Sequence, residues 1–120
     1  MPDPCPCGSR SSFDDCCGPL LGATALADTA EQLMRSRYTA NFYGNAEHLW
    51  RTWHPRTRPQ QVTLDQGMKW TGLRILEVDG GGPGDQRGIV SFVASYEGGS
   101  MHERSIFERR GGRWLYLDEE

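Results

Sequence analysis

The pattern of hydrophobic and polar positions predicts two helices in the first half of the chain. Between Thr29 and Gly44, apolar side chains recur every three or four residues, which is typical of a helix with one buried stripe. Thr29 is followed three residues later by Gln32, as in a capping box, and Gly44 is a typical residue after a helix C-terminus. A second, shorter helix is predicted to begin after Asn45 and to end near His54, where a proline follows. The side of this helix that we expect to be buried carries Leu49, Trp50 and Trp53.

From residue 70 onward the pattern changes to the two-residue period of β-strands. Along 89–96, one set of alternate side chains is Val90, Phe92, Ala94 and Tyr96. Glycine-rich stretches at 80–85, 97–100 and 110–113 predict the turns between strands. The order of two helices followed by an antiparallel meander of about four strands predicts an α+β fold with the helices on one face of the sheet.

Residues 1–19 have a different composition from the rest of the chain. They are rich in Pro, Gly, Ser and Cys and show no hydrophobic period. A segment this small needs a metal or a disulfide to fold. We therefore expect three parts: a metal knuckle at 1–19, a connector at 20–28, and an α+β domain at 29–120.

The four cysteines of this segment form the strongest motif in the sequence: Cys5, Cys7, Cys16 and Cys17. Two short pairs of thiolates match the tetrahedral shell that zinc prefers. Gly8 and Gly18 follow the two pairs, where positive φ angles are expected. Disulfides, reduced structural thiols and a redox role are the alternatives, and two disulfides within so short a segment would be strained. Because four thiolates leave no open position, the zinc is predicted to be structural.

The segment CPCGSRSSFDDCCG resembles the SEC-C motif, a zinc-binding knuckle found at the C-terminus of the SecA translocation ATPase. The resemblance implies that the four cysteines bind the metal. It also implies docking on an acidic chaperone or on ribosomal RNA, through lysines of the translocase motif. Here Asp14 and Asp15 lie between the cysteine pairs, and their carboxylates would repel phosphates.

The whole chain resembles the YchJ-like family, through TAEQLMRSRYTANFYGNAEHLWRTWHP, KWTGLRI and MHERSIFERRGGRWLYLD. Members carry a SEC-C motif ahead of a nuclear transport factor 2-like (NTF2-like) domain. The resemblance implies a cystatin-like cone, in which a curved antiparallel sheet wraps around the helices and encloses a cavity. It implies no particular activity.

Glu103 is the residue most expected to face such a cavity. Strand alternation places it on the same side as Ser105 and Phe107, where a charge is unusual unless it is paired or functional. One hypothesis pairs Glu103 with Arg35 or Arg37, either as a buried structural ion pair or as part of a ligand site. The full set of pocket candidates is Arg35, Arg37, Tyr38, His54, Trp70, Glu103 and Arg104. His54, at a helix end, is more typical of a capping or packing group than of a catalytic one.

The net charge and the motifs of the chain disfavour some classes of function and favour others. The formal net charge of -3 disfavours general nucleic-acid binding, and no apolar stretch approaches the roughly 20 residues that span a bilayer. Without a signal sequence, the chain is predicted to be cytoplasmic. No nucleophile or phosphate-binding motif is present, so we expect an adaptor that docks proteins through the knuckle, ahead of a small-molecule binder or enzyme using the cavity. RNA contact through the knuckle ranks third, and a homodimer through the exposed sheet face is left open.

Overall fold

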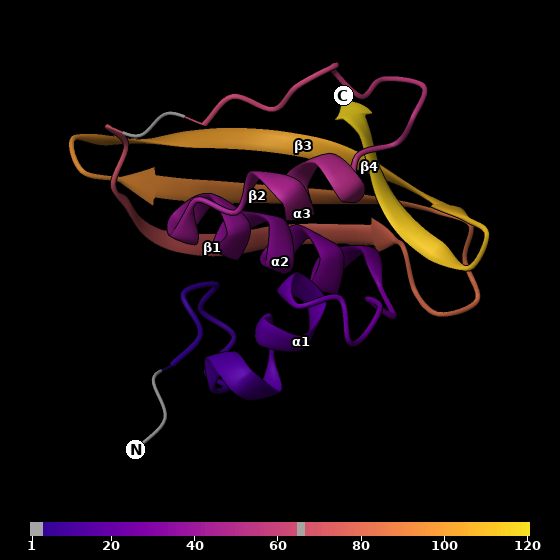
Figure 1. Cartoon of the computed structure of the whole chain (residues 1–120), viewed down its shortest axis with the longest axis horizontal. Coiled ribbons are helices and arrows are strands. Elements are labelled where there is room, and N and C mark those ends of the chain that lie inside the picture. The colour runs from indigo at the N-terminus through magenta and orange to yellow at the C-terminus, as the bar shows by residue number, and fades with distance from the viewer. Residues whose placement is uncertain (1–3, 65–66) are drawn as a thin grey trace.

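Helices cover one face of a four-stranded antiparallel sheet in the computed structural model, which describes residues 4–64 and 67–120 (Figure 1). The helical elements are the 3-10 helix η1 (Phe13–Asp15), α1 (Gly18–Leu21), α2 (Ala30–Tyr43) and α3 (Ala46–Arg51). The strands are β1 (Trp70–Gly80), β2 (Arg87–Tyr96), β3 (Gly99–Arg110) and β4 (Arg113–Glu119). Each strand pairs with the next in the order β1-β2-β3-β4, which confirms the predicted α+β fold and its meander.

The long helix α2 begins and ends at the predicted residues. The Thr29 side chain accepts a hydrogen bond from the Gln32 amide at 3.1 Å, and the Gln32 side chain reaches back to the Asp28 amide at 2.7 Å. These bonds satisfy backbone N–H groups that have no partner within the helix. Gly44 follows the last turn with φ of 76°, in the left-handed region that glycine adopts without strain.

The second predicted helix is α3, and it is shorter than expected. Asn45 caps its start by accepting from the His48 amide at 3.0 Å, but the helix ends at Arg51, ahead of His54. Its buried residues are His48 and Leu49. The prediction that Trp50 is buried is wrong, because its side chain is 40% exposed with the Arg58 guanidinium 3.6 Å above its ring.

The sheet follows the predicted alternation, with the apolar face of β2 turned toward the helices. Val90, Phe92 and Ala94 are buried there. The turn between β3 and β4 consists of Gly111 and Gly112, with φ angles of 59° and 79°. Positive angles at both positions match the twist of the flanking strands in a tight hairpin.

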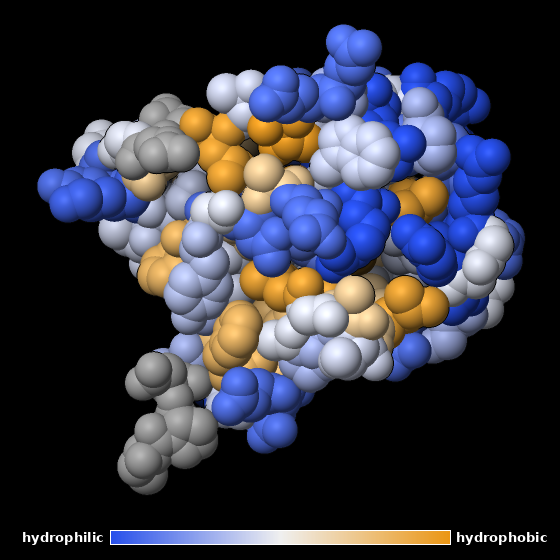
Figure 2. All heavy atoms as spheres, in the orientation of Figure 1, coloured by the Kyte–Doolittle hydropathy of each residue, from blue (hydrophilic) through white to orange (hydrophobic). Residues whose placement is uncertain are grey.

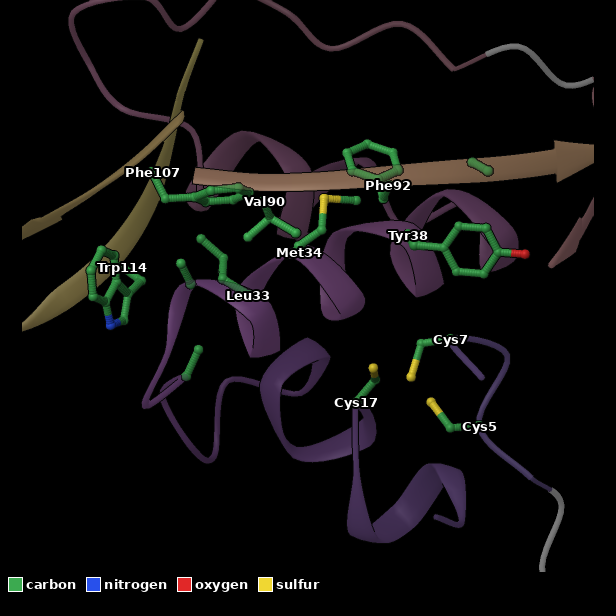
Figure 3. Packing of buried hydrophobic residues seen from close by; sticks show 13 residues of the cluster. Cys5, Cys7, Cys17, Leu33, Met34, Tyr38, Val90, Phe92, Phe107 and Trp114 are labelled. Carbon is green, nitrogen blue, oxygen red and sulfur yellow. The ribbon is translucent and has the colours of Figure 1, made fainter. Parts of the chain in front are cut away.

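The buried core is continuous from the sheet to the N-terminal segment. Figure 3 shows Phe92 at β2, Met34 between this strand and α2, and Cys5, Cys7 and Cys17 below α2 in the view. All five residues belong to one buried cluster. On the face shown in Figure 2, hydrophobic side chains lie in separate groups among hydrophilic ones. Within 4–64 and 67–120, no helix has both the length and the apolar character needed to span a membrane. The division of the chain at 19 and 28 stays a prediction.

Candidate metal centre and cavity

The four cysteine sulfurs come together at one point beside α2. All four lie within 4.8 Å of one another, with 3.6 Å between Cys7 and Cys16 and 3.9 Å between Cys16 and Cys17. A tetrahedral metal with bonds of about 2.3 Å to sulfur separates its ligands by about 3.8 Å. The thiols are free, not joined in disulfides. Their spacing therefore fits the shell of one four-coordinate metal ion.

Short backbone features bring the two cysteine pairs together. The first pair lies on a loop closed by a hydrogen bond from the Cys5 amide to the Ser11 carbonyl at 2.8 Å. Gly8 in this loop has φ of 79°, as predicted. The same prediction for Gly18 is wrong, because this residue is the first of helix α1. Gly18 is required there for space, since a Cβ would lie 2.8 Å from the Phe13 carbonyl oxygen.

Polar side chains of α2 hold the cysteine cluster against the helix. The Thr39 hydroxyl donates to Cys17 Sγ at 3.3 Å, and Arg35 donates to the Cys7 carbonyl at 2.7 Å. A hydrogen bond from the Cys17 thiol lowers the pKa of Cys7, so the cluster favours negative charge on sulfur. Figure 3 shows the sulfurs of Cys5, Cys7 and Cys17 pointing toward one another. The arrangement is a buried anionic pocket that a metal cation would neutralise.

A separate cavity of about 270 Å³ lies between α2 and the sheet. Four of the pocket candidates line it: Arg37, Tyr38, Trp70 and Glu103. The predicted ion pair of Glu103 with Arg35 or Arg37 is not formed among the described residues. The Glu103 carboxylate instead accepts a hydrogen bond from the Ser105 hydroxyl, and burial raises its pKa.

Arg35 lies on the cysteine side of α2 rather than at the cavity. It forms an ion pair with Glu31 one turn earlier, at 2.9 Å, and its second contact is the Cys7 carbonyl. Arg35 and Arg37 are two positions apart, so they point to different sides of the helix. Residue spacing alone could not decide which of these two arginines faces the sheet.

His54 and Arg104 also lie away from the cavity. His54 Nε2 is 3.3 Å from Glu108 Oε1, and its Nδ1 accepts from the Arg56 amide at 3.0 Å. Arg104 is on the opposite face of β3 from Glu103, where it contacts Ser91 and Glu120. Arg104 was nevertheless included among the pocket candidates, although strand alternation puts neighbouring residues on opposite faces of a sheet.

Sequence reasoning missed two aromatic residues of the cavity wall, Trp53 and Tyr116. A backbone bridge joins Trp53 to Tyr116 and brings the segment after α3 alongside β4. Their rings meet edge to face with centroids 5.2 Å apart. Burial raises the pKa of Tyr116 to about 12. The one local signal for the direction of the Tyr116 side chain was strand alternation, which places it on the same face of β4 as Trp114.

Two family models match the chain. The SEC-C motif matches residues 1–19, and the YchJ middle NTF2-like domain matches residues 29–119. A UPF0225 protein of Streptomyces coelicolor is 57% identical over 117 residues, covering 98% of this chain and 94% of the relative. A UPF0225 protein of Deinococcus radiodurans is 45% identical over 120 residues, covering 96% and 87%.

Solved structures show the same architecture. A SEC-C motif containing protein from Rhodopseudomonas palustris, solved in solution, has a TM-score of 0.83 at 36% identity, with 98% of each chain covered. A crystal structure of a SEC-C motif containing protein from Psychrobacter arcticus has a TM-score of 0.79 at 25% identity, covering 97% of this chain and 81% of that one. These matches confirm the resemblance inferred from the motifs. The chain belongs to the UPF0225 family, in which a SEC-C motif precedes a YchJ-type NTF2-like domain.

Proposed function

We propose that the four thiolates bind one structural zinc ion, and that the protein is a non-catalytic accessory protein that docks a basic segment of a partner protein beside this site. Zinc suits a closed shell of four thiolates, which leaves no position for substrate or water. In the apo state, the crowded thiols could not all ionise beside one another. Metal binding would therefore allow all four thiols to ionise, and it would hold the knuckle against α2.

The observation that carries the docking proposal is an acidic groove of about 420 Å³ between the knuckle and α2. Asp15 comes from the knuckle, Asp28 from the connector, and Glu31 from α2. Among the described residues of the lining, Arg35 is the one cation, and it is paired with Glu31. The groove is thus net negative, and it depends on the knuckle being in place.

The chemistry of the groove defines the partner. Leu26, 62% exposed, and Leu20 line the same groove and supply its apolar surface. A peptide with two basic residues and one aliphatic side chain between them would satisfy both kinds of contact. The same carboxylates disfavour the phosphates of RNA. A basic protein segment therefore fits this groove better than a nucleic acid.

The test uses a fluorescent lysine–leucine peptide and zinc-loaded protein, with binding followed by anisotropy. The double variant Asp15→Asn/Asp28→Asn should weaken binding about tenfold or more, because two charge contacts are lost. The matched control Asp79→Asn/Asp118→Asn changes the same number of exposed charges away from the groove. Equal effects of the two double variants, or unchanged binding after chelation of the metal, would refute a groove that depends on the knuckle.

A further inference from the structure

The cavity on the sheet side of α2 has the composition of a ligand site. It receives side chains from α2 and from all four strands. Trp70 and Phe92 give it aromatic walls, and Met101, 37% exposed, marks where it meets solvent. Ligand sites in proteins are mostly apolar hollows with a few polar groups that fix the orientation of the ligand. The polar groups here therefore decide what the cavity would hold.

Arg37 is a buried cation that forms no direct ion pair with any described residue, although the charge of Glu103, which lines the same cavity, interacts with it. The residue is 8% exposed, and its guanidinium lies against the rings of Trp53 and Tyr116, at 5.2 and 4.6 Å from their centroids. One of its terminal nitrogens donates to Leu49 O and to Thr52 Oγ1. Within the described ranges no carboxylate forms an ion pair with it, and burial lowers its pKa to about 10, which leaves it charged at neutral pH. An unpaired buried charge is costly, and a bound anion would remove that cost.

Other groups of the cavity also lack acceptors. The indole N–H of Trp53 is buried without a hydrogen-bond partner in residues 4–64 and 67–120. The Tyr38 hydroxyl, on a residue 3% exposed, lies near the Gly72 amide but forms no hydrogen bond of ordinary geometry. Glu103 is the one carboxylate of the lining, and it already accepts from Ser105. Two buried groups of the cavity lining, the Trp53 indole and the Tyr38 hydroxyl, are therefore donors that a ligand oxygen could satisfy.

We propose that this cavity binds a small carboxylic acid with a flat apolar body, its carboxylate on Arg37 and its body between the aromatic walls. A carboxylate supplies the charge and the acceptors that the donors lack. The size is suitable, because an apolar cavity of about 150 Å³ accommodates benzene, and the remaining volume holds a short acidic side chain. This cavity and the acidic groove lie on different faces of α2, so each can be tested without the other.

Glu103 makes binding dependent on pH. Burial and the neighbouring Glu119 of β4 raise its pKa, whereas the Ser105 hydroxyl and Arg37 of α2 oppose the shift, and Tyr116 of β4 is the other titratable group beside it. A ligand carboxylate adds a second negative charge and favours protonation of Glu103 further. The protonated carboxyl then donates a hydrogen bond to the ligand. Binding therefore takes up a proton, and it weakens as the pH rises through the raised pKa of Glu103.

The test compares 3-phenylpropionate with its neutral amide by calorimetry on the zinc-loaded full chain. The acid should bind at least about tenfold more tightly than the amide, as expected for a charge-assisted contact with a buried arginine. Arg37→Met should abolish this preference, whereas Arg74→Met, which removes an exposed charge from β1, should not change it. Ala94→Leu, which fills the cavity from β2, should abolish binding of both compounds.

Three results would overturn the proposal: equal affinity for acid and amide, full binding by Ala94→Leu, or no binding of the acid at millimolar concentration. Arg37→Met also removes the hydrogen bonds to Leu49 and Thr52. If that variant does not fold, the acid–amide comparison on the unmodified protein and the Ala94→Leu result decide the matter.

Discussion

His48 makes the fold sensitive to mild acid. The residue is 2% exposed, with its Nε2 atom 2.9 Å from Ser36 Oγ and its Nδ1 atom 3.0 Å from an Arg51 nitrogen. Because arginine only donates, Nδ1 must accept and Nε2 must carry the proton. The Ser36 hydroxyl in turn donates a hydrogen bond to Leu33 O at 2.7 Å. The network is thus complete only with a neutral imidazole. Burial first, and then the charges of Arg51 and Arg37, lower the pKa of His48 from 6.5 to about 4.

The sign and size of the effect follow from these two pKa values. Above pH 6.5 the imidazole is neutral in both states and does not affect stability. Between pH 6.5 and 4 the unfolded chain binds a proton that the folded protein does not, so stability falls with the pH. The difference between the unfolded and folded pKa values of His48 corresponds to about 3 kcal/mol of stability. About 2 kcal/mol of this stability is lost between pH 7 and pH 5.

The assay is urea unfolding of zinc-loaded protein at pH 7 and pH 5. His48→Gln keeps an N–H group for Ser36 and does not titrate in this range. Cysteine protonation weakens the metal site of both proteins alike, so the variant subtracts that contribution. The original protein should lose about 2 kcal/mol more than His48→Gln. Parallel losses in the two proteins would show that the imidazole is not held neutral.

Three further predictions concern the metal and the fold. Purified reduced protein should hold one zinc ion per chain in a colorimetric assay after denaturation, and Cys17→Ser should lower both the zinc content and the melting temperature. Gly88→Ala should destabilise by about 2 kcal/mol or more in urea, because its Cβ would lie 2.5 Å from Gly81 Cα, whereas Gly84→Ala, with open space, should change stability by less than about 0.5 kcal/mol. Thr29→Ala should cost about 1 kcal/mol through the lost cap, and a loss as large in Thr29→Ser would contradict a role for the hydroxyl.

Local chemistry predicted the elements that depend on neighbours in sequence. The caps at Thr29 and Asn45 and the glycine hairpin before β4 need no knowledge of the rest of the fold. Trp50 could not be placed in this way. Helical spacing alone does not show which side of so short a helix is buried. His48 is on the buried side, where its Nε2 atom contacts Ser36 of α2.

In the candidate sites too, features set by residues close in sequence were predictable, and features set by the tertiary fold were not. The cysteine cluster was predictable because its ligands lie close in sequence and their chemistry is specific. Part of the cavity lining was anticipated, namely Arg37, Tyr38, Trp70 and Glu103, whereas Trp53 and Tyr116 were missed. Tyr116 shares a face of β4 with Trp114, but its position against Arg37 also depends on the irregular register between β3 and β4 at Ile106 and Phe107, which the sequence does not reveal. The acidic groove joins three separate segments, so it emerged only in three dimensions.

Helix α2 places consecutive residues on two different sites. Thr39 contacts a sulfur of the cysteine cluster, and Tyr38, its neighbour in the chain, lines the cavity. A cobalt(II) ion bound by the four sulfurs would therefore lie on the other side of the same helix from a molecule beside Tyr38. In NMR spectra, the paramagnetic shifts caused by that ion depend on distance, so they would locate the bound molecule in solution without a crystal structure.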